Sequence, residues 1–207
     1  MRALVTGGSR GIGAALVAEG RARGHDVTGT ARDGAMGLDV TDAAAQARLA
    51  AATGPLDLLV CNAGIYVDRE ADIRTITPEQ LADSFAVNVT GVVLTVQAQL
   101  PNLSRGGRIA VISSQMGSSE KRGAAGLAYR ASKAAAINLA LNLAEALRPE
   151  GIAVGVYHPG WVRTDMGGGS AAISPEDAAR GLWDRFETLT LETTGRFETW
   201  DGRAHPI

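Results

Sequence analysis

The stretch RALVTGGSRGIGAALVAEGRARG, residues 2–24, decides the fold class. Its first part, at 2–6, is a short apolar run that predicts a buried strand. Its last part, at 11–24, has the apolar spacing of an amphipathic helix and closes on a glycine, which is typical of a helix C-terminus. A glycine-rich turn at 6–13 joins the two. A strand that passes through a tight glycine turn into a helix predicts an α/β protein.

The rest of the chain repeats this alternation of strands and helices. Continuous apolar runs are typical of parallel strands that are buried on both faces. The sequence predicts further strands at 26–31, 56–61, 107–113, 151–158 and 196–200. Because no linker separates these units, we expect one domain over residues 1–207, with a doubly wound, mostly parallel sheet of six to seven strands and helices on both faces.

Two helix starts are marked by their sequences. TPEQ at Thr77 and SPED at Ser174 each offer a hydroxyl N-cap followed by proline at the first helical position. A third helix is predicted at 127–147. The segment GLDV at 37–40 follows the second strand too closely for a full parallel crossover, so we expect either a stub strand or an extended loop there.

Composition narrows the function classes. The net charge of the 207-residue chain is -2, which gives no electrostatic footprint for nucleic acid or an anionic membrane surface. The single cysteine, Cys61, excludes an internal disulfide and favours a reducing compartment, and no apolar run is long enough to span a bilayer. Three histidines without ligand spacing predict no metal site. We therefore expect a cytoplasmic protein that binds neither nucleic acid nor membrane.

The glycine turn is suited to a dinucleotide. Gly7, Gly11 and Gly13 follow the pattern G-x3-G-x-G, which lets the backbone approach a pyrophosphate at the N-terminus of the following helix. Such turns also occur without a ligand. Here the position between the first strand and a helix favours dinucleotide binding.

The helix predicted at 127–147 begins with a phenol and an ammonium. Tyr129 and Lys133 lie four residues apart, so both side chains share one face of its first turns. In an arbitrary protein the tyrosine would cap the core and the lysine would reach solvent. A free tyrosine, with a pKa of about 10, is a poor acid–base catalyst near neutral pH, and a neighbouring cation lowers that pKa by stabilising the phenolate. The pair therefore also fits proton transfer.

Seven motifs along the chain strengthen the interpretation that Tyr129 and Lys133 take part in proton transfer. In chain order they are TGGSRGIG (6–13), LDVTD (38–42), CNAG (61–64), FAVNVTG (85–91), VISS (111–114), YRASK (129–133) and HPGWVRTDM (158–166). In this order they resemble the short-chain dehydrogenase/reductase family over nearly the whole chain, and the YRASK, PGWVRTDMGG and FETWDG segments resemble its carbonyl-reductase-like, C-factor-type branch. Cys61 stands where asparagine is more usual in the family.

The resemblance implies a Rossmann fold and an NADP(H)-dependent oxidoreductase that moves a hydride between nicotinamide and a carbonyl or alcohol substrate. Tyr129 would transfer the proton, Lys133 would hold the nicotinamide ribose, and Ser114 would bind the substrate oxygen. Asn88 would position a water behind Lys133. Ser113 is a rival to Ser114, because the spacing from Ser114 to Tyr129 is slightly longer than in many relatives.

The cofactor site is expected to draw on residues from several motifs. They are Gly7, Ser9, Arg10, Gly11, Ile12, Gly13, Arg32, Asp39, Val40, Asn62, Ala63, Gly64, Tyr129, Lys133, Pro159, Gly160, Val162 and Thr164. Arg10 and Arg32 match the charge and geometry of a 2′-phosphate, so NADP is expected over NAD, unless Asp33 faces the ribose instead.

Several points stay open in the sequence. A dinucleotide-binding sensor or interaction protein on the same fold is the alternative function, and the full set of four candidate catalytic residues favours an enzyme. His158 is interpreted as structural, and Trp161 is expected either to flank the substrate or to pack. The short segment 167–173 implies an open, permissive site for small carbonyl or alcohol substrates. Relatives pair through helices near 88–103 and 131–147, and the Ala-rich faces here are compatible with a homodimer or homotetramer.

Overall fold

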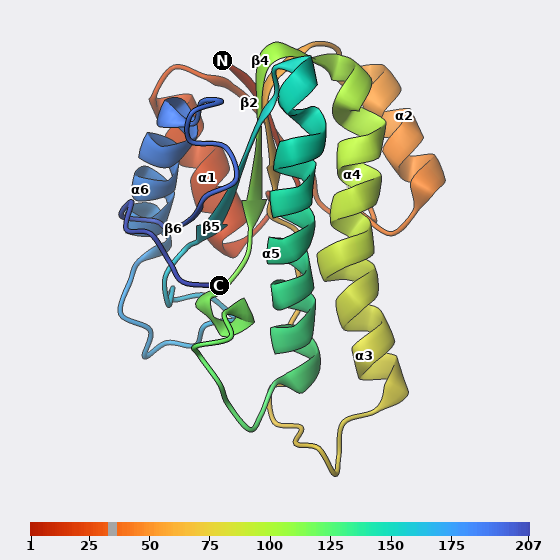
Figure 1. The fold of residues 1–207 in the computed structure, drawn as a ribbon, viewed down its shortest axis with the longest axis vertical. Coiled ribbons are helices and arrows are strands. Elements are labelled where there is room, and N and C mark those ends of the chain that lie inside the picture. Colours follow the sequence, from red (N-terminus) through yellow and green to blue (C-terminus); the bar gives the residue numbers. More distant parts are fainter. Residues whose placement is uncertain (33–36) are drawn as a thin grey trace.

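The computed structural model describes residues 1–32 and 37–207 and contains one six-stranded sheet in the order β2-β1-β3-β4-β5-β6 (Figure 1). The strands are β1 (Arg2–Val5), β2 (Asp26–Gly29), β3 (Leu56–Cys61), β4 (Leu103–Ile112), β5 (Ala153–His158) and β6 (Phe197–Thr199). Every neighbouring pair is parallel. The α/β Rossmann fold expected from the sequence is confirmed, with six strands.

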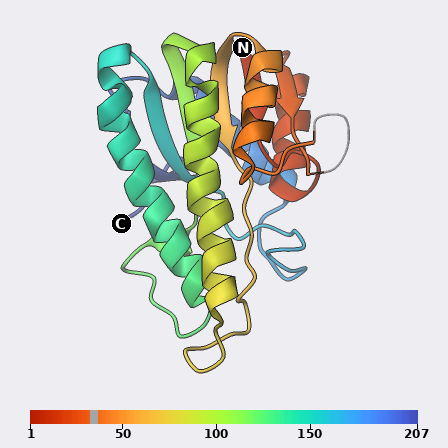
Figure 2. The same ribbon diagram turned by 90° about the vertical axis from the view of Figure 1, so that its right-hand side faces the viewer.

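Helices cover both faces of the sheet. They are α1 (Gly11–Ala22), α2 (Ala43–Thr53), α3 (Pro78–Phe85), α4 (Gly91–Gln99), α5 (Leu127–Leu147) and α6 (Pro175–Thr188). The side chains of α1 and α6 share one buried cluster with the sheet, and those of α2, α4 and α5 share the other. Figure 2 shows α5, α4 and α2 side by side on one face. This two-sided cover is the doubly wound arrangement that the sequence predicts.

Element boundaries shift by a few residues where glycine changes the backbone. Helix α1 ends at Ala22, before Gly24, whose φ of 81° lies in the left-handed region. Strand β5 begins at Ala153 and not at Gly151, because Gly151 has a φ of 77° and ends a 3-10 turn. The N-caps expected at both marked helix starts are confirmed: Thr77 caps α3 and Ser174 caps α6 through their hydroxyls.

Residues 37–40 form an extended loop and not a stub strand. Strand β2 stops at Gly29, two residues earlier than expected. The only pairing the described residues show there is an isolated bridge between Ala31 and Gly37, beside a hydrogen bond from the Leu38 N–H to the Ala31 carbonyl oxygen at 2.7 Å. This edge of the sheet is therefore thin, as the short connection requires.

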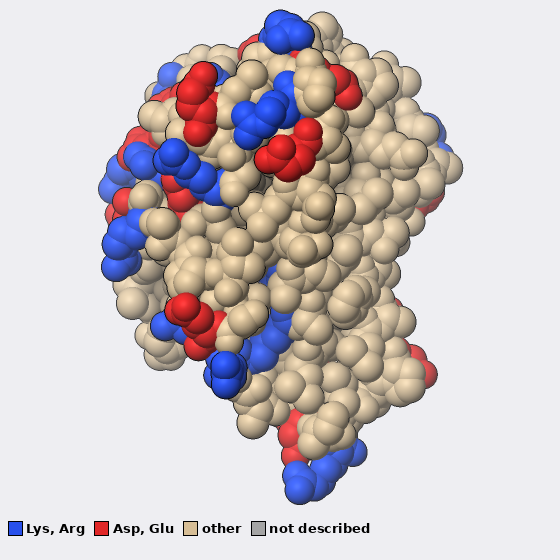
Figure 3. All heavy atoms as spheres, in the orientation of Figure 1, with Lys and Arg blue, Asp and Glu red and all other residues tan. Residues whose placement is uncertain are grey.

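Helices α3 and α4 run into each other through a π turn at Ala86–Thr90. By length and composition alone, Pro78–Asn102 could cross a membrane, which corrects the expectation that no run is long enough. Core helices of soluble proteins pass the same test, and this one carries the buried polar residues Asn88, Thr95 and Gln99 and packs beside α5. The middle of the surface over α4 and α5 carries few charged side chains (Figure 3).

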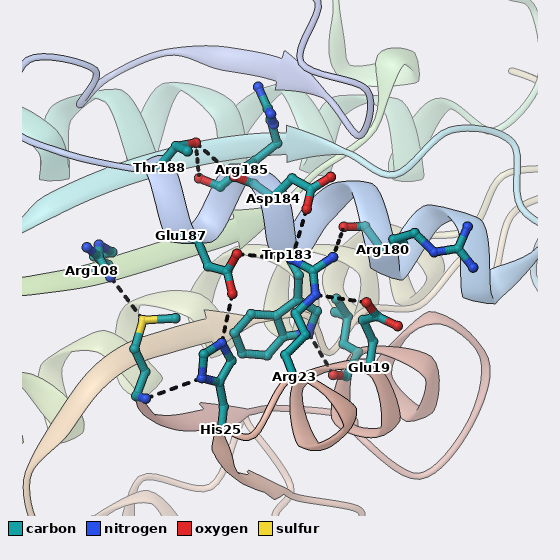
Figure 4. A network of polar contacts seen from close by, with 12 residues as sticks. Glu19, Arg23, His25, Arg108, Arg180, Trp183, Asp184, Arg185, Glu187 and Thr188 are labelled. Carbon is teal, nitrogen blue, oxygen red and sulfur yellow. Dashed lines mark hydrogen bonds and ion pairs between the residues drawn. The ribbon is translucent and has the colours of Figure 1, made fainter.

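At the other face, a polar network joins the end of α1 to α6 (Figure 4). The Arg23 guanidinium donates to carboxylate oxygens of Glu19 at 2.8 Å, Asp184 at 2.8 Å and Glu187 at 3.0 Å, and to the Arg180 carbonyl oxygen at 2.9 Å. Because one planar guanidinium serves four acceptors, its ordering cost is shared among several bonds.

We expect Arg23→Ala to lower the free energy of unfolding by about 1–2 kcal/mol, since it removes four hydrogen bonds, of which the one to Glu19 is partly buried and the others are exposed. Arg180→Ala is the control, because the Arg180 guanidinium makes one exposed pair with Asp177 at 3.0 Å. Urea unfolding of the three proteins measures both losses. Equal losses for the two variants would contradict a special role for Arg23.

Candidate active site

The residues that follow β1 and β3 are tied together at the carboxyl edge of the sheet. The Thr6 hydroxyl oxygen accepts from the backbone N–H groups of Asn62 and Ala63 at 3.0 and 3.1 Å. The Asn62 side-chain amide donates in turn to the carbonyl oxygens of Thr6 at 2.9 Å and Gly7 at 3.2 Å. Thr6 was not among the predicted site residues, although it opens the glycine motif. It fixes the start of the glycine turn against the CNAG segment.

The glycine turn has the geometry of a phosphate cradle. Gly7 and Gly11 have φ values of 67° and 54°, and a Cβ on Gly13 would lie 2.0 Å from the Gly7 carbonyl oxygen. The helix that follows, α1, has Arg10 at its N-cap with no side-chain cap and no acidic residue in its first turn. Helices α2, α3 and α6 all have side-chain caps. The first N–H groups of α1 are thus left for an anion.

Tyr129 and Lys133 lie in the first turns of α5 and are both buried. Burial raises the pKa of the Tyr129 phenol to about 12, and a hydrogen bond with the Ser114 side chain opposes part of that rise in pKa. Burial also lowers the pKa of the Lys133 ammonium to about 8. The largest cause of the raised pKa of Tyr129 is desolvation of the phenol, which disfavours the charged phenolate.

The Lys133 ammonium is held by a backbone carbonyl at the end of β4 and lies near the Tyr129 ring. Its Nζ donates to the Ile112 carbonyl oxygen at 3.0 Å and lies 5.8 Å from the centroid of the Tyr129 ring. A Cβ on Gly64 would lie 3.3 Å from the same Nζ and 3.1 Å from Asn88 Oδ1. Gly64 therefore marks a close approach between the CNAG segment and the catalytic candidates.

The two serines at the end of β4 have different contacts. The Ser113 hydroxyl donates to the Lys133 carbonyl oxygen at 3.0 Å, which docks α5 on the strand. The Ser114 hydroxyl oxygen accepts from the Met116 N–H at 3.1 Å, and the Ser114 side chain acts to lower the pKa of Tyr129, against the larger effect of burial. These contacts favour Ser114 over Ser113 as the partner of the phenol.

Asn88 is buried in the π turn, and its side chain bonds protein atoms. Its Oδ1 accepts from the Ile65 N–H at 2.9 Å, and its Nδ2 donates to the Ile65 carbonyl oxygen at 3.0 Å and the Ser132 hydroxyl at 3.0 Å. Both amide hydrogens are therefore used within the protein. These bonds fix the loop at Ile65 beside Lys133, and the hold of Asn88 on a water stays a prediction.

Asp68 and Tyr66 were missed by the sequence analysis, because nothing local marks an acidic cap 60 residues from its helix. The fully buried Asp68 carboxylate accepts from the N–H groups of Ala128 at 2.6 Å and Tyr129 at 3.2 Å, and so caps α5. The Tyr66 ring stacks on Tyr129 at 4.2 Å between centroids. Together they hold the phenol from below and beside.

The segment after β5 returns to the glycine turn. A Cβ on Gly11 would lie 3.2 Å from Thr164 Cγ2, which brings Thr164 to the N-terminus of α1. Pro159 and Val162 are buried, and Gly160 has a φ of 88° at the turn out of the strand. Thr164 of this segment therefore reaches from the end of β5 to the N-terminus of α1.

Two arginines hold the residues that directly precede the short segment 167–173. Arg10 donates to the Asp165 carboxylate at 2.9 Å, and both side chains are exposed. Arg69 donates to the Met166 carbonyl oxygen and lies over the Tyr66 ring at 5.2 Å from its centroid. The segment 167–173 is short, as predicted, and Arg10 and Arg69 hold the residues in front of it.

Arg32 and residues 37–40 form the described part of the expected adenosine corner. Arg32 is exposed at the end of β2, while Asp33, its rival for the ribose, lies outside the described residues. The Asp39 carboxylate accepts from the Thr41 hydroxyl at 2.7 Å and the Thr41 N–H at 2.9 Å; these bonds lower the pKa of Asp39, and the Arg32 charge adds to the effect. Val40 is buried against Gly91 of α4. Ser9 is exposed and Ile12 packs against the core.

The comparison with known families decides the identity of this fold. The family model described as short chain dehydrogenase matches residues 34–172, which is more than half of the chain. The chain belongs to the short-chain dehydrogenase family.

Relatives within the family agree with the narrower resemblance. The chain is 37% identical over 158 residues to C-signal of Myxococcus xanthus, which covers 74% of this chain and 94% of that protein. It is 32% identical over 220 aligned positions to 1-hydroxy-2-glutathionyl-2-methyl-3-butene dehydrogenase of Rhodococcus sp. strain AD45, with 96% of each chain covered. The NADPH-bound carbonyl reductase from chicken fatty liver has a TM-score of 0.90 at 28% identity, over 100% of this chain and 98% of that one. The likeness to the C-factor-type, carbonyl-reductase-like branch is confirmed.

We expect Asp68→Ala to lower the free energy of unfolding by about 1–3 kcal/mol, because two buried N–H groups at the start of α5 lose their acceptor. Asp72→Ala is the matched control. The Asp72 carboxylate also accepts from a backbone N–H, that of Arg74 at 2.8 Å, but in an exposed turn. Thermal and urea unfolding of both variants check the difference, and a control loss as large as that of Asp68→Ala would refute the capping role.

Proposed function

We propose that this chain is an NADP(H)-dependent oxidoreductase of the carbonyl reductase or alcohol dehydrogenase type. The observation that carries the proposal is the buried Tyr129 phenol, whose pKa burial raises and the Ser114 side chain acts to lower, followed on the same helix face by the buried Lys133. It lies at the same sheet edge as the glycine turn, where an open α/β sheet binds its ligands.

The chain's own residues fit a dinucleotide. The uncapped first turn of α1 and the glycine cradle would hold the pyrophosphate, and Thr164 stands at the same helix end. Asn62, Ala63 and Gly64 line the approach toward Lys133, and Lys133 would hold the nicotinamide ribose. When bound, the nicotinamide supplies or takes up the hydride. Similar structures solved with NADPH or NADP bound support this choice of cofactor.

In carbonyl reduction the Tyr129 phenol acts as the acid, and its protonation state at neutral pH suits that role. With a pKa of about 12, Tyr129 holds its proton at neutral pH and can give it to a substrate oxygen that Ser114 also contacts. As the proton leaves, the ammonium of Lys133 stabilises the phenolate. Alcohol oxidation uses the same groups in reverse. Asn88 acts as a positioning residue, since its amide fixes the loop at Ile65.

The proposal extends to the protein's partners and location. We infer a small carbonyl or alcohol as substrate, with no nucleic acid or membrane partner, and a homodimer or homotetramer through the weakly charged surface of α4 and α5. The buried free thiol of Cys61 fits a reducing cytoplasm. A non-catalytic sensor would bind the same cofactor, and a turnover assay separates the two.

Tyr129→Phe tests the chemistry, because it removes only the hydroxyl. We expect the variant to fold and to bind NADPH, while kcat for aldehyde reduction falls by about 10²–10⁴-fold. Lys133→Ala should weaken NADPH binding more than Tyr129→Phe does, since it also removes the contact to the ribose. Steady-state kinetics and a nucleotide titration measure these effects, and a Tyr129→Phe enzyme within threefold of the wild-type kcat would rule out the assignment.

Cofactor preference is the second test. We expect kcat/KM for NADPH to exceed that for NADH by about tenfold to a hundredfold, because guanidinium–phosphate contacts are charge-assisted and here partly exposed. Arg32→Ala should reduce this ratio several-fold. Arg105→Ala is the control, because Arg105 lies in the first residues of β4, at the opposite end of the sheet. Parity between the cofactors, or an unchanged ratio in Arg32→Ala, would show that Arg32 does not face the phosphate.

A further inference from the structure

A hollow of about 360 Å³ opens beside the carboxyl ends of β5 and β6. Gln115, which directly follows Ser114, lies on one wall, and Trp161, which follows the turn after β5, lies on another. In the proposed function Ser114 holds the substrate oxygen. The inference below rests on that function, because the hollow then lies where the remainder of a substrate would extend.

The charged side chains that line the hollow are basic, although the Asp201 carboxylate acts on His158 from outside the lining. The walls of the hollow include Lys121 and Arg203 and, in the part of the chain that the structure describes, no Asp or Glu. Arg203 is already paired with Asp201 at 2.8 Å, whereas the described residues give Lys121 no ion-pair partner. The indole rings of Trp161 and Trp200 add broad apolar walls. These features fit a flat apolar body that carries a negative charge.

His158 adds a buried polar group to this hollow. It is the last residue of β5 and is 7% exposed, and its Nδ1 is sealed from solvent with no partner among the described residues. A sealed N–H without an acceptor is rarer in proteins than an unpaired acceptor, so the proton belongs on Nε2. Burial lowers the pKa of His158 to about 4, so the ring is neutral at neutral pH. The edge that reaches the hollow then presents a neutral N–H donor.

We propose that this hollow selects aromatic aldehydes and ketones that bear a carboxylate. The His158 Nε2–H donates to a carboxylate oxygen, Lys121 supplies the opposite charge at the rim, and the two indoles flank the ring. In turnover the carbonyl carbon gains the hydride of NADPH and its oxygen gains the Tyr129 proton, so 4-formylbenzoate becomes 4-hydroxymethylbenzoate and NADPH becomes NADP⁺. His158 is therefore a specificity residue, in addition to its place in the strand.

The test compares 4-formylbenzoate with its methyl ester, which has the same ring and aldehyde but no charge. We expect wild-type kcat/KM to be at least about fivefold higher for the carboxylate, as one partly exposed charge contact and one hydrogen bond would give. Lys121→Gln should bring this ratio close to one. Arg122→Gln removes the same charge from the same loop but does not line the hollow, so its ratio should stay within about twofold of wild type.

His158→Phe separates recognition from folding. The ring volume is kept and the unpaired Nδ1 disappears, so the melting temperature should hold or rise. The carboxylate-to-ester ratio should nevertheless fall several-fold. A merely structural histidine would leave that ratio unchanged. An ester used as well as the carboxylate by the wild type, or equal ratios in Lys121→Gln and Arg122→Gln, would overturn the proposal.

Binding without turnover keeps this inference apart from the proposed function. Benzoate has no carbonyl that accepts a hydride, and two of the three tryptophans line the hollow, so its binding is read as quenching of tryptophan fluorescence. We expect benzoate to quench the wild type with at least about threefold higher affinity than Lys121→Gln, and benzyl alcohol not to quench. If no aldehyde is reduced but benzoate binds in this way, the proposed function fails and the site stands. Equal quenching by benzoate and benzyl alcohol would overturn the site.

Discussion

The docking of the first turns of α5 on the end of β4 is the constraint on which the site depends. Asp68 caps the start of the helix, Ser113 holds the Lys133 carbonyl oxygen, and the Lys133 ammonium reaches the Ile112 carbonyl oxygen. A Cβ on Gly117 would lie 2.7 Å from the Lys133 backbone, so the turn after β4 fits tightly against the same helix. These contacts place one phenol and one ammonium in the protein interior, away from solvent.

Burial shifts the pKa values of Tyr129 and Lys133 in opposite directions. The neutral form of a buried phenol is favoured, which raises the pKa of Tyr129 to about 12, and the neutral form of a buried amine is favoured too, which lowers the pKa of Lys133 to about 8. The pair is thus set by desolvation more than by mutual attraction. In the proposed function this leaves a protonated acid next to a cation. The burial of Lys133 also rules out the alternative of a core tyrosine beside a solvated lysine.

Sequence signals that depend on neighbouring residues predicted the fold well. Features that depend on contacts between distant parts of the chain could not be predicted. The six apolar runs became the six strands, and the hydroxyl caps at Thr77 and Ser174 formed, because both depend on neighbouring residues. Asp68 could not be found from the sequence, since its cap partners lie far along the chain. The raised pKa of Tyr129 in the cofactor-free chain could not be foreseen for a related reason. A helix spacing shows the distance to Lys133, but it does not show how deeply both residues are buried.

A titration of Lys133 in the cofactor-free protein tests this account most directly. The chain contains only two lysines, Lys121 and Lys133, so ¹³C labelling of the lysine Cε gives two NMR signals, and a Lys133→Met variant assigns them. The account predicts that the Lys133 signal titrates with a midpoint near 8. A midpoint at the ordinary lysine value of about 10.4 would show that Lys133 is solvated and would contradict the account.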